Sequence, residues 1–548
     1  MSLKKTSVSL ALVLLILVGA CDVGDVGPGG DFNGGGSGGS GETLHNFRET
    51  LSWGSLYTPM TLGLTPGNDT TEIGVSWYFQ GGAAGRVAQV RFFRGTLEAG
   101  TGLIQATGTA RAATPGFTTH QVTVRGLIPG SDYLYSVSGD GVNWSELHRL
   151  RIPPDTRNFR FAIVGDPQVK DMGLTVDPST RYPSLDTTIA EGWRMTMERI
   201  VAREPAFILS MGDQISNQGS NTEGAWIDFF SPPGLRNIPF APAAGNHDRA
   251  PPDSMLHHFV IPNEQRIPGL TPDNAIWANY FFLYNNVLFV GLNTSGGTSN
   301  VPDPRVRSHI IPMFRQTLAN ATTQHAGNFD WLIVFHHKST ASVAYHVANF
   351  DIQEWVEAGF ETLMSEFNVD FVLAGHDHVF ARSFPLAGKG GGLVSVPDTT
   401  RGGEWCDTMG GGSYVIRNPR RGEPIYVTFT SSSGEGFYSV ITDRTFPFPA
   451  GRPFNQTNPV YPFLGVNPAT GEATLAGAVS YLAGNLPVSN AVFHQPRVPS
   501  YTIVEVGPNS ITFRTYPIGT VSGHTPGALE PFSFTAGVPY DSFTVIRD

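Results

Sequence analysis

Apolar and polar residues alternate along the chain from about residue 43 to residue 154. Short runs such as residues 72–77 and 121–124 follow a period of two and are separated by turn residues. This alternation is typical of half-buried β-strands, and histidine and carboxylate side chains do not cluster among these runs. The pattern therefore predicts an all-β sandwich over residues 43–154 with no chemistry of its own.

After Pro153 and Pro154 the pattern changes to longer apolar runs separated by segments with helical periodicity. Residues 159–164 and 207–211 are mostly apolar, which is typical of buried strands, and apolar residues recur at helical spacing between them. Further strands are expected at these runs: residues 280–284, 287–292, 331–335, 370–374, 500–506 and 510–516. We therefore predict a second domain of the α/β (α+β) class.

This second domain is expected to span residues 155–520. Two stretches in it lack periodicity, the Gly-rich residues 388–412 and the irregular residues 446–495, and we interpret both as insertions. Residues 521–548 are interpreted as a C-terminal extension. A chain of 548 residues is long enough for two separate cores.

The first 21 residues have the composition of an export signal. Two lysines precede an apolar run at residues 8–18, which is too short to favour a membrane-spanning helix. Residues 18–21, Val-Gly-Ala-Cys, resemble the lipobox of bacterial lipoproteins, which implies that Cys21 is lipidated; an ordinary secretory signal is the alternative. Residues 22–42 are rich in Gly and Ser and are expected to form a flexible tether. We therefore expect an extracytoplasmic protein whose lipid is its only attachment to a bacterial membrane.

The charge balance excludes one class of partner. The chain has 46 acidic and 35 basic residues and a formal net charge of -11, which argues against a surface that coats nucleic acid. A site for an anionic ligand must therefore supply its positive charge locally. Bound metal ions supply such charge without lysine or arginine.

Five short polar motifs occur in the second domain, and at least four of them directly follow a predicted strand. In chain order they are Gly165-Asp166-Pro167-Gln168, Gly212-Asp213, Gly245-Asn246-His247-Asp248, His336-His337 and Gly375-His376-Asp377-His378. Each motif alone has a structural explanation, since Gly-Asp is common in loops and a buried histidine pair is usually structural. Ligand-binding residues gather at the carboxyl ends of strands in open α/β sheets. Taken together, the motifs therefore predict one site with oxygen and nitrogen donors for metal ions.

This set of motifs resembles the calcineurin-like metallophosphoesterase superfamily, whose pattern is D-x-H, GD, GNH[DE], a later H and GHxH. Residues 127–137 resemble the closing half of a fibronectin type III domain. With such a sandwich in front, the chain resembles bacterial relatives of purple acid phosphatases. The resemblance implies a four-layer αββα fold, in which two mixed sheets pack face to face with helices outside.

The resemblance also implies a centre of two metal ions. Asp166 and His378 would hold the first ion, and Asp213 would bridge both, since one carboxylate can bind two cations and reduce their repulsion. Gln168 stands where the superfamily commonly has a histidine. Its amide oxygen either ligates the first metal or hydrogen-bonds a metal-bound water.

The second ion would be held by Asn246, His336 and His376. Because the histidine is doubled, His337 is an alternative to His336, and we prefer His336. Carboxylate, imidazole and amide donors suit Fe, Mn or Zn. Purple acid phosphatases owe their colour to a tyrosine three residues after the bridging aspartate, and Ser216 occupies that position here. We therefore expect no such colour.

Four further residues are assigned to catalysis or to the pocket. By the resemblance, His247 stabilises charge on the phosphoryl group or protonates the leaving alkoxide. Asp248 would orient the His247 imidazole by accepting its other ring proton. His258 and His346 are candidates for the lining of the pocket.

The predicted function is hydrolysis of phosphate monoesters by a hydroxide that bridges the two metal ions. A phosphodiesterase or nucleotide-hydrolysing enzyme is the enzymatic alternative, because the same metal pair serves both reactions. A third hypothesis is a surface binding protein that keeps an inactive catalytic domain as a scaffold.

Overall fold

The computed structural model describes parts of the chain from residue 58 to its last residue. These parts are residues 58–95, 102–170, 189–216, 222–249, 254–266, 277–295, 303–344, 346, 349–388, 393–394, 407–409, 413–438, 490–523 and 532–548. The predicted signal peptide, Cys21, the tether and most of the two predicted insertions lie outside them. Within the described residues, no helix combines the length and hydropathy needed to cross a bilayer. All of them fall within one unit, Glu42–Asp548.

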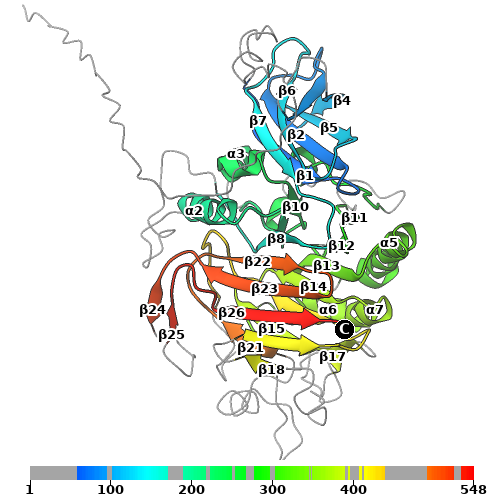
Figure 1. Cartoon of the computed structure of the whole chain (residues 1–548), viewed down its shortest axis with the longest axis vertical. Coiled ribbons are helices and arrows are strands. Elements are labelled where there is room, and N and C mark those ends of the chain that lie inside the picture. Colours follow the sequence, from blue (N-terminus) through cyan, green and yellow to red (C-terminus); the bar gives the residue numbers. More distant parts are fainter. Residues whose placement is uncertain are drawn as a thin grey trace, which may run out of the picture. The chain divides into compact units, whose positions relative to one another are not determined.

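The N-terminal part is all-β, as the alternation predicts. Its seven strands are β1 (Met60–Pro66), β2 (Glu72–Gln80), β3 (Ala88–Arg94), β4 (Leu103–Ala112), β5 (Phe117–Arg125), β6 (Ser131–Ser138) and β7 (His148–Ile152). They run in the order β1-β2-β5-β4-β3-β6-β7, and every pair is antiparallel. We call this part the β1–β7 unit (Figure 1).

Strand β4 connects the two halves of the β1–β7 unit. Its first part, residues 103–108, pairs with β3, and its last part, residues 109–112, pairs with β5. A Cβ atom on Gly108 would lie only 1.9 Å from the carbonyl oxygen of Gln121, so only glycine allows the two strands to approach here. The inward-facing apolar residues of both halves, such as Val75 and Val122, form one core.

The second part contains two large sheets. The first runs β10 (Phe240–Pro242), β9 (Ile208–Ser210), β8 (Phe159–Val164), β22 (Ser500–Val506), β23 (Ser510–Pro517), β26 (Asp541–Ile546), β19 (Ser413–Arg417) and β18 (Asp407–Met409). The second runs β11 (Tyr280–Tyr284), β12 (Val287–Gly291), β13 (Trp331–Lys338), β14 (Phe371–Gly375), β20 (Ile425–Thr428), β15 (Phe380–Pro385) and β21 (Asn490–His494). Two small hairpins accompany them: β16 (Ala387–Gly388) with β17 (Leu393–Val394), and β24 (Val521–Gly523) with β25 (Phe532–Phe534).

One predicted boundary is wrong. The sequence pattern placed residues 521–548 in an extension outside the catalytic fold, yet β26 lies between β23 and β19 inside the first sheet. Its inward residues Phe543 and Val545 belong to the core between the sheets. The fold therefore continues to within two residues of Asp548.

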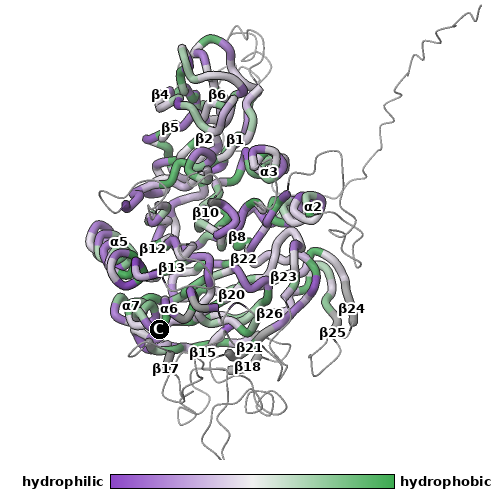
Figure 2. The backbone as a smooth tube through the Cα atoms, turned by 180° about the vertical axis from the view of Figure 1, so that it is seen from behind, coloured by the Kyte–Doolittle hydropathy of each residue, from purple (hydrophilic) through white to green (hydrophobic). Residues whose placement is uncertain are grey.

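The helices lie over the outer faces of the two sheets. They are α2 (Ile189–Val201), α3 (Thr222–Phe229), α4 (Met255–His258), α5 (Ile311–Gln324), α6 (Phe350–Glu357) and α7 (Phe360–Glu366). Trp193 of α2 packs with Ile208 of the first sheet, and Phe314 of α5 packs with Val334 of the second. In Figure 2, α5 carries both hydrophobic and hydrophilic residues, as expected for a helix with one buried face.

The parallel strands determine where the polar motifs meet. In the first sheet β10, β9 and β8 are parallel neighbours, and in the second sheet β13 and β14 are parallel neighbours. The carboxyl ends of parallel strands lie at one edge of a sheet. The core between the sheets contains Phe161 and Phe335, so the motifs that follow these strands face one another across it.

Glu361 of α7 predicts a stability that depends on pH. Its side chain is fully buried, and burial raises the pKa of Glu361 from 4.5 to about 7, although its own backbone and Thr340 hydrogen-bond to the charged form. A carboxyl whose pKa is higher in the folded state binds more protons there, so its contribution to stability falls as pH rises from 4.5 to 7. The difference between these pKa values corresponds to about 3 kcal/mol at most.

We therefore expect Glu361→Gln to raise the free energy of unfolding above pH 7 by about 1–3 kcal/mol and to change it little at pH 4.5. Urea unfolding at pH 4.5 and pH 8 measures this difference. Glu366→Gln on the same helix, whose side chain is exposed and pairs with Arg315, is the matched control. A Glu361→Gln variant that is no more stable than the parent at pH 8 would contradict the expectation.

Candidate metal centre

The structure brings four of the five motifs together completely and the fifth through one of its two histidines. Asp166 follows β8, Asp213 lies three residues after the end of β9, and Asn246 follows β10. On the second sheet, His337 lies in β13, and the Gly-His-Asp-His motif begins at the end of β14. The site is therefore built from the carboxyl ends of five strands in two sheets.

His337 is at the centre of this arrangement. Its Nε2 atom lies 2.9 Å from Oδ1 of Asn246, 3.2 Å from Oδ2 of Asp213 and 3.1 Å from Nδ1 of His376. Neighbouring ligands on a metal ion with bonds of about 2.1 Å are separated by about 3.0–3.4 Å. Ligand atoms of Asp213, His337 and His376 lie within 4.8 Å of one another, and this triad is a candidate metal-binding group.

The hydrogen bond on the other side of the His337 ring identifies its tautomer. Nδ1 lies 2.8 Å from the carbonyl oxygen of Met211, so Nδ1 carries a proton and donates it. In the neutral ring the lone pair of Nε2 then faces the oxygens of Asp213 and Asn246, which are acceptors as well. Such a group of acceptors is stable only with a cation between them, and a histidine that donates its other ring proton to a backbone carbonyl is typical of metal sites.

Asp166 and His378 form the second half of the centre. Nε2 of His378 lies 3.4 Å from Oδ1 of Asp166, while its Nδ1 lies 2.6 Å from the carbonyl oxygen of Gly436. The tautomer argument therefore applies to His378 as well. The backbone N–H of His376 donates to both carboxylate oxygens of Asp166, at 2.9 and 3.0 Å, and fixes the orientation of that carboxylate.

Gln168 makes a contact that the sequence did not predict. Its amide nitrogen donates to Oδ2 of Asp213 at 2.8 Å, and its backbone N–H donates to the carbonyl oxygen of Asp213 at 2.7 Å. The Asp213 carboxylate also accepts the backbone N–H of His247 at 2.8 Å. Asp213 therefore contacts both halves of the centre, as a bridging ligand would.

The charges at the centre favour cations. Burial opposes ionisation of Asp213, but attraction to His337 and His247 holds the pKa of its carboxyl below the usual range. Burial likewise opposes protonation of His337, but the carboxylates of Asp213 and Asp166 raise the pKa of His337 to about 9. Burial, together with His346 and His337, lowers the pKa of His376 well below its usual value. The centre therefore stabilises positive charge while it keeps His376 in the neutral form that binds metals.

Backbone strain is concentrated at the same residues. The residues Asp166, Gln168, Asp213, His376 and His378 all have a positive φ, between 40° and 71°. This conformation is unfavourable for residues other than glycine and is retained mainly where function requires it. The strain turns each of these side chains towards the gap between the sheets.

Two glycines of the motifs are required by close approach. A Cβ atom on Gly375 would lie 2.4 Å from Oδ2 of Asp166, and one on Gly245 would lie 2.0 Å from the backbone nitrogen of Asp213. These distances are far below van der Waals contact. Each glycine therefore allows one loop to pack directly against a candidate ligand from a neighbouring strand.

The preference for His336 over His337 is wrong. Successive side chains of a strand point to opposite faces, and His336 points away from the centre, where its ring packs edge-on against Phe360 at 4.9 Å between centroids. Its Nδ1 atom lies 3.5 Å from the hydroxyl of Thr294. His337 shares a face with Phe335, which lies between the sheets, and it is therefore the histidine at the site.

His247 and Asp248 occupy the loop predicted for them, but Asp248 has a different role. Nε2 of His247 lies 3.9 Å from Oδ2 of Asp213, and its side chain is 20% exposed, so solutes can reach it. The two carboxylate oxygens of Asp248 accept the backbone N–H groups of Ile215 and Gly245, at 3.2 and 2.9 Å. The expected contact with the His247 imidazole is thus replaced by bonds that brace the loop.

The two other candidate histidines separate. The ring of His346 lies 4.1 Å from that of His376, and Tyr438, which the sequence did not indicate, packs against His346 and His378. His346 is therefore at the centre, held there by its backbone N–H, which donates to Oδ1 of Asp377 at 2.8 Å.

The prediction that His258 lines the pocket is wrong. Its ring is fully buried and is stacked between Tyr78 of the β1–β7 unit and Trp226 of α3. Nε2 of His258 lies 3.5 Å from a carboxylate oxygen of Glu223. The residue therefore connects two parts of the fold.

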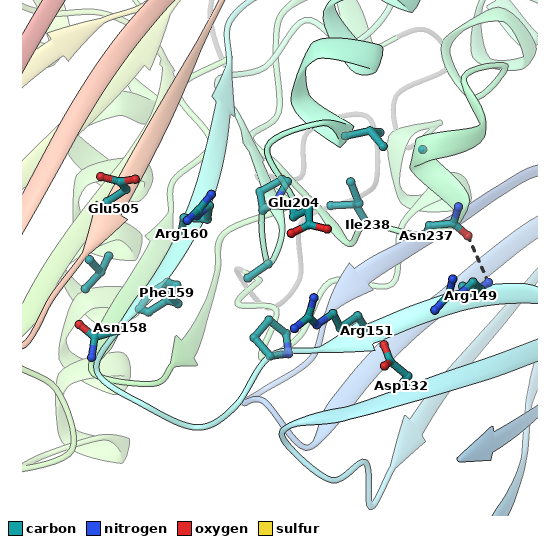
Figure 3. A pocket seen from close by; sticks show the side chains of 16 residues that line it. Asp132, Arg149, Arg151, Asn158, Phe159, Arg160, Glu204, Asn237, Ile238 and Glu505 are labelled. Carbon is teal, nitrogen blue, oxygen red and sulfur yellow. Dashed lines mark hydrogen bonds between the residues drawn. The ribbon is translucent and has the colours of Figure 1, made fainter. Parts of the chain in front are cut away.

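A separate hollow of about 690 Å³ lies at the amino end of β8, next to Asn158 and Arg160. Because Asp166 follows the carboxyl end of that strand, the hollow and the candidate metal centre lie at opposite ends of β8. Figure 3 shows Arg151 of β7 and Glu204 on its walls. Its charged side chains are exposed and of both signs, so they select no one class of ligand.

Two facing sheets that bring carboxylate, amide and imidazole donors into one cluster define a metal-dependent hydrolase. Residues 159–380 match the family described as calcineurin-like phosphoesterase. This part of the chain is therefore a calcineurin-like metallophosphoesterase domain, and the protein is a hydrolase.

Known proteins resemble the chain beyond this domain. Two uncharacterized proteins, from two strains of Mycobacterium tuberculosis, are each 27% identical to it over 380 residues, which is 63% of this chain and 68% of each relative. The structure of a purple acid phosphatase from yellow lupin (Lupinus luteus) seeds superimposes with a TM-score of 0.56 at 14% identity. The superposition covers 90% of this chain and 75% of the lupin protein. That likeness shows a shared fold.

Proposed function

We propose that the protein hydrolyses phosphate monoesters at a centre of two metal ions. The observation that carries the proposal is the meeting of acceptor atoms around Nε2 of His337, which faces the oxygens of Asn246 and Asp213. Only a cation satisfies all of them at once, since each atom offers a lone pair. In a chain with a net charge of -11, cations also supply the attraction for an anionic substrate.

The residues divide between the two ions. Asn246, His337 and His376 would hold one ion, and Asp166 and His378 would hold the other. Asp213 would serve both, because it contacts His337 on one side and the amide of Gln168 on the other. Gln168 then orients the shared carboxylate. Carboxylate, amide and imidazole donors suit Fe, Mn or Zn.

When bound, the two ions would lower the pKa of water and neutralise charge on the phosphoryl oxygens. The protein's own residues would then orient the ester. His247 is partly exposed beside Asp213, so its imidazole can donate a proton to the departing alkoxide oxygen. His346 and Tyr438 form a wall beside His376 and His378. Burial, first of all, raises the pKa of Tyr438, so its hydroxyl stays neutral and does not repel a phosphate.

Ser216 bears on the metal and on the colour of the protein. Its side chain is buried, and its backbone N–H donates to the carbonyl oxygen of Val169 at 2.9 Å. Since a serine hydroxyl is a poor ligand for Fe(III) compared with a phenolate, we infer a colourless protein whichever of these metals it contains.

Elemental analysis and a paired ester assay test the proposed function. We expect about two metal ions per chain and hydrolysis of p-nitrophenyl phosphate at least about tenfold faster, in kcat/KM, than of its bis(p-nitrophenyl) ester. Removal of the metals with a chelator should abolish both activities, and added Mn²⁺ or Zn²⁺ should restore them. Faster hydrolysis of the diester would favour the phosphodiesterase alternative. A protein that binds no metal and hydrolyses neither ester would favour a non-catalytic binding protein.

We also infer that the protein acts outside the cytoplasm, attached to a membrane by lipid on Cys21. The Val-Gly-Ala-Cys sequence at residues 18–21 supports this inference, and the Gly/Ser-rich residues 22–42 would separate the enzyme from the membrane surface. We further infer that the β1–β7 unit is a fibronectin type III-like domain, which its antiparallel strands and single core support.

A further inference from the structure

Helix α4 leaves its last carbonyl groups without partners in its own backbone. It has only four residues, Met255–His258, and the last four carbonyls of any α-helix lack intrahelical donors. Leu256, Met255 and His258 are buried, so water does not readily supply those donors. Buried carbonyl groups without partners would destabilise this segment.

The β1–β7 unit supplies the missing donors from two strands. The amide nitrogen of Gln121 donates to the carbonyl oxygens of Leu256 at 2.7 Å and Phe259 at 3.1 Å. The hydroxyl of Thr119 donates to the carbonyl oxygen of His257 at 2.5 Å. We call these contacts, together with the two in the next paragraph, the α4 clamp.

Two more residues complete the α4 clamp. The hydroxyl of Ser76 donates to the carbonyl oxygen of His258, and Arg111 donates to that of Leu256 at 3.3 Å. Ser76 pairs with Gln121 across strands β2 and β5. The donors therefore lie on the face of the unit opposite its apolar core. Polar residues that alternate with a core are normally exposed, but Ser76 and Thr119 are both fully buried here.

The α4 clamp is connected to the candidate metal centre by a short series of hydrogen bonds. Ser254, directly before α4, donates its hydroxyl to the carbonyl oxygen of Asp248 at 3.1 Å. The Asp248 carboxylate in turn accepts the backbone N–H groups of Gly245 and Ile215. Gly245 directly precedes Asn246, so the loop that carries this candidate ligand is held from the side of α4.

We propose that the β1–β7 unit positions Asn246 and His247 through the α4 clamp, with Gln121 and Thr119 as positioning residues. The inference rests on the proposed function in so far as these residues serve hydrolysis. The unit then contributes to the reaction although it brings no residue into the centre. Coupling over this distance passes through a continuous set of packed and hydrogen-bonded groups, and a displacement of about 1 Å at a reacting centre can reduce a rate about a hundredfold.

The test compares variants that remove donors with one that only destabilises the unit. Thr119→Val and Gln121→Met keep the size of each side chain but remove its donor, and Thr119→Ser restores a donor. Val75→Ala makes a cavity in the apolar core of the same sheet and is the matched control, because it lowers stability without touching the α4 clamp. All variants are full-length and are measured well below their unfolding temperatures.

In the Thr119→Val/Gln121→Met double variant we expect kcat for p-nitrophenyl phosphate to fall by roughly ten- to a hundredfold. The affinity of the metal-free protein for Mn²⁺ should fall about tenfold, by calorimetric titration. Val75→Ala should leave both quantities within about twofold, and Thr119→Ser should restore most of the loss seen in Thr119→Val. A double variant that matches Val75→Ala in both quantities would overturn the proposal.

Hydrogen exchange gives a readout that depends on neither metal nor activity. The backbone N–H groups of Gly245 and His247 are bonded to the carboxylates of Asp248 and Asp213. In the double variant these amides should exchange at least about tenfold faster than in Val75→Ala. If the parent protein fails to hydrolyse esters while this difference is present, the proposed function is wrong and the α4 clamp stands. Equal protection in the two variants overturns the α4 clamp whatever the activity.

Discussion

His337→Ala is expected to reduce phosphate-ester hydrolysis about a thousandfold or more, whereas His336→Ala is expected to keep most of the parent's activity. The two residues are adjacent in β13, and both are fully buried. Nε2 of His337 meets Asn246, Asp213 and His376, while His336 contacts Phe360 and Thr294 on the opposite face. Removal of the His337 imidazole therefore removes a candidate ligand, and removal of His336 removes only packing.

The two variants control for each other. Each loses the same buried imidazole, so each should lose about 2–4 kcal/mol of stability from the cavity alone. Metal content measured on the purified proteins separates the two effects: we expect His337→Ala to have lost at least one ion per chain and His336→Ala to match the parent. Loss of metal in His336→Ala with normal content in His337→Ala would reverse the assignment.

The sequence alone could not make this choice, and the reason is physical. A strand with one exposed face shows alternation that identifies the inner side. Strand β13 is covered on both faces, by the other sheet at Phe335 and by helices at Val334, and both faces are apolar. The motif therefore located the histidine pair without identifying which member faces the gap.

Local patterns predicted the elements better than their arrangement. The apolar runs predicted β8, β13 and β14, because a buried strand needs few residues and its signal is contiguous. The position of β26 beside β23 was missed, because pairing between distant segments leaves no mark in either one. The role of Asp248 was likewise mistaken, since whether its carboxylate meets the His247 ring or the backbone of Gly245 and Ile215 depends on the folded loop.

Asp213→Asn is expected to abolish binding of both metal ions and to lower kcat/KM by about 10⁴-fold. Asparagine keeps the shape of the side chain but removes its charge, and it places a second amide group among the donors of His247 and Gln168. In the parent those two residues donate to the carboxylate at 2.8 Å each. Attraction to His337 and His247 outweighs burial and keeps the pKa of Asp213 low, so the lost charge is present at every working pH.

The matched control is Asp370→Asn, at the opposite end of β14. Asp370 is also a buried carboxyl group, bonded to the backbone N–H of Leu332 at 2.8 Å and paired with Arg547. Its loss should lower stability by about 1–3 kcal/mol and leave metal content unchanged. Elemental analysis and steady-state rates of the two variants can then be compared directly. If Asp213→Asn retains two ions and more than about a tenth of the parent's kcat/KM, Asp213 does not bridge the ions. The arrangement around Nε2 of His337 would then hold a single cation, and Asp166 with His378 would need another partner.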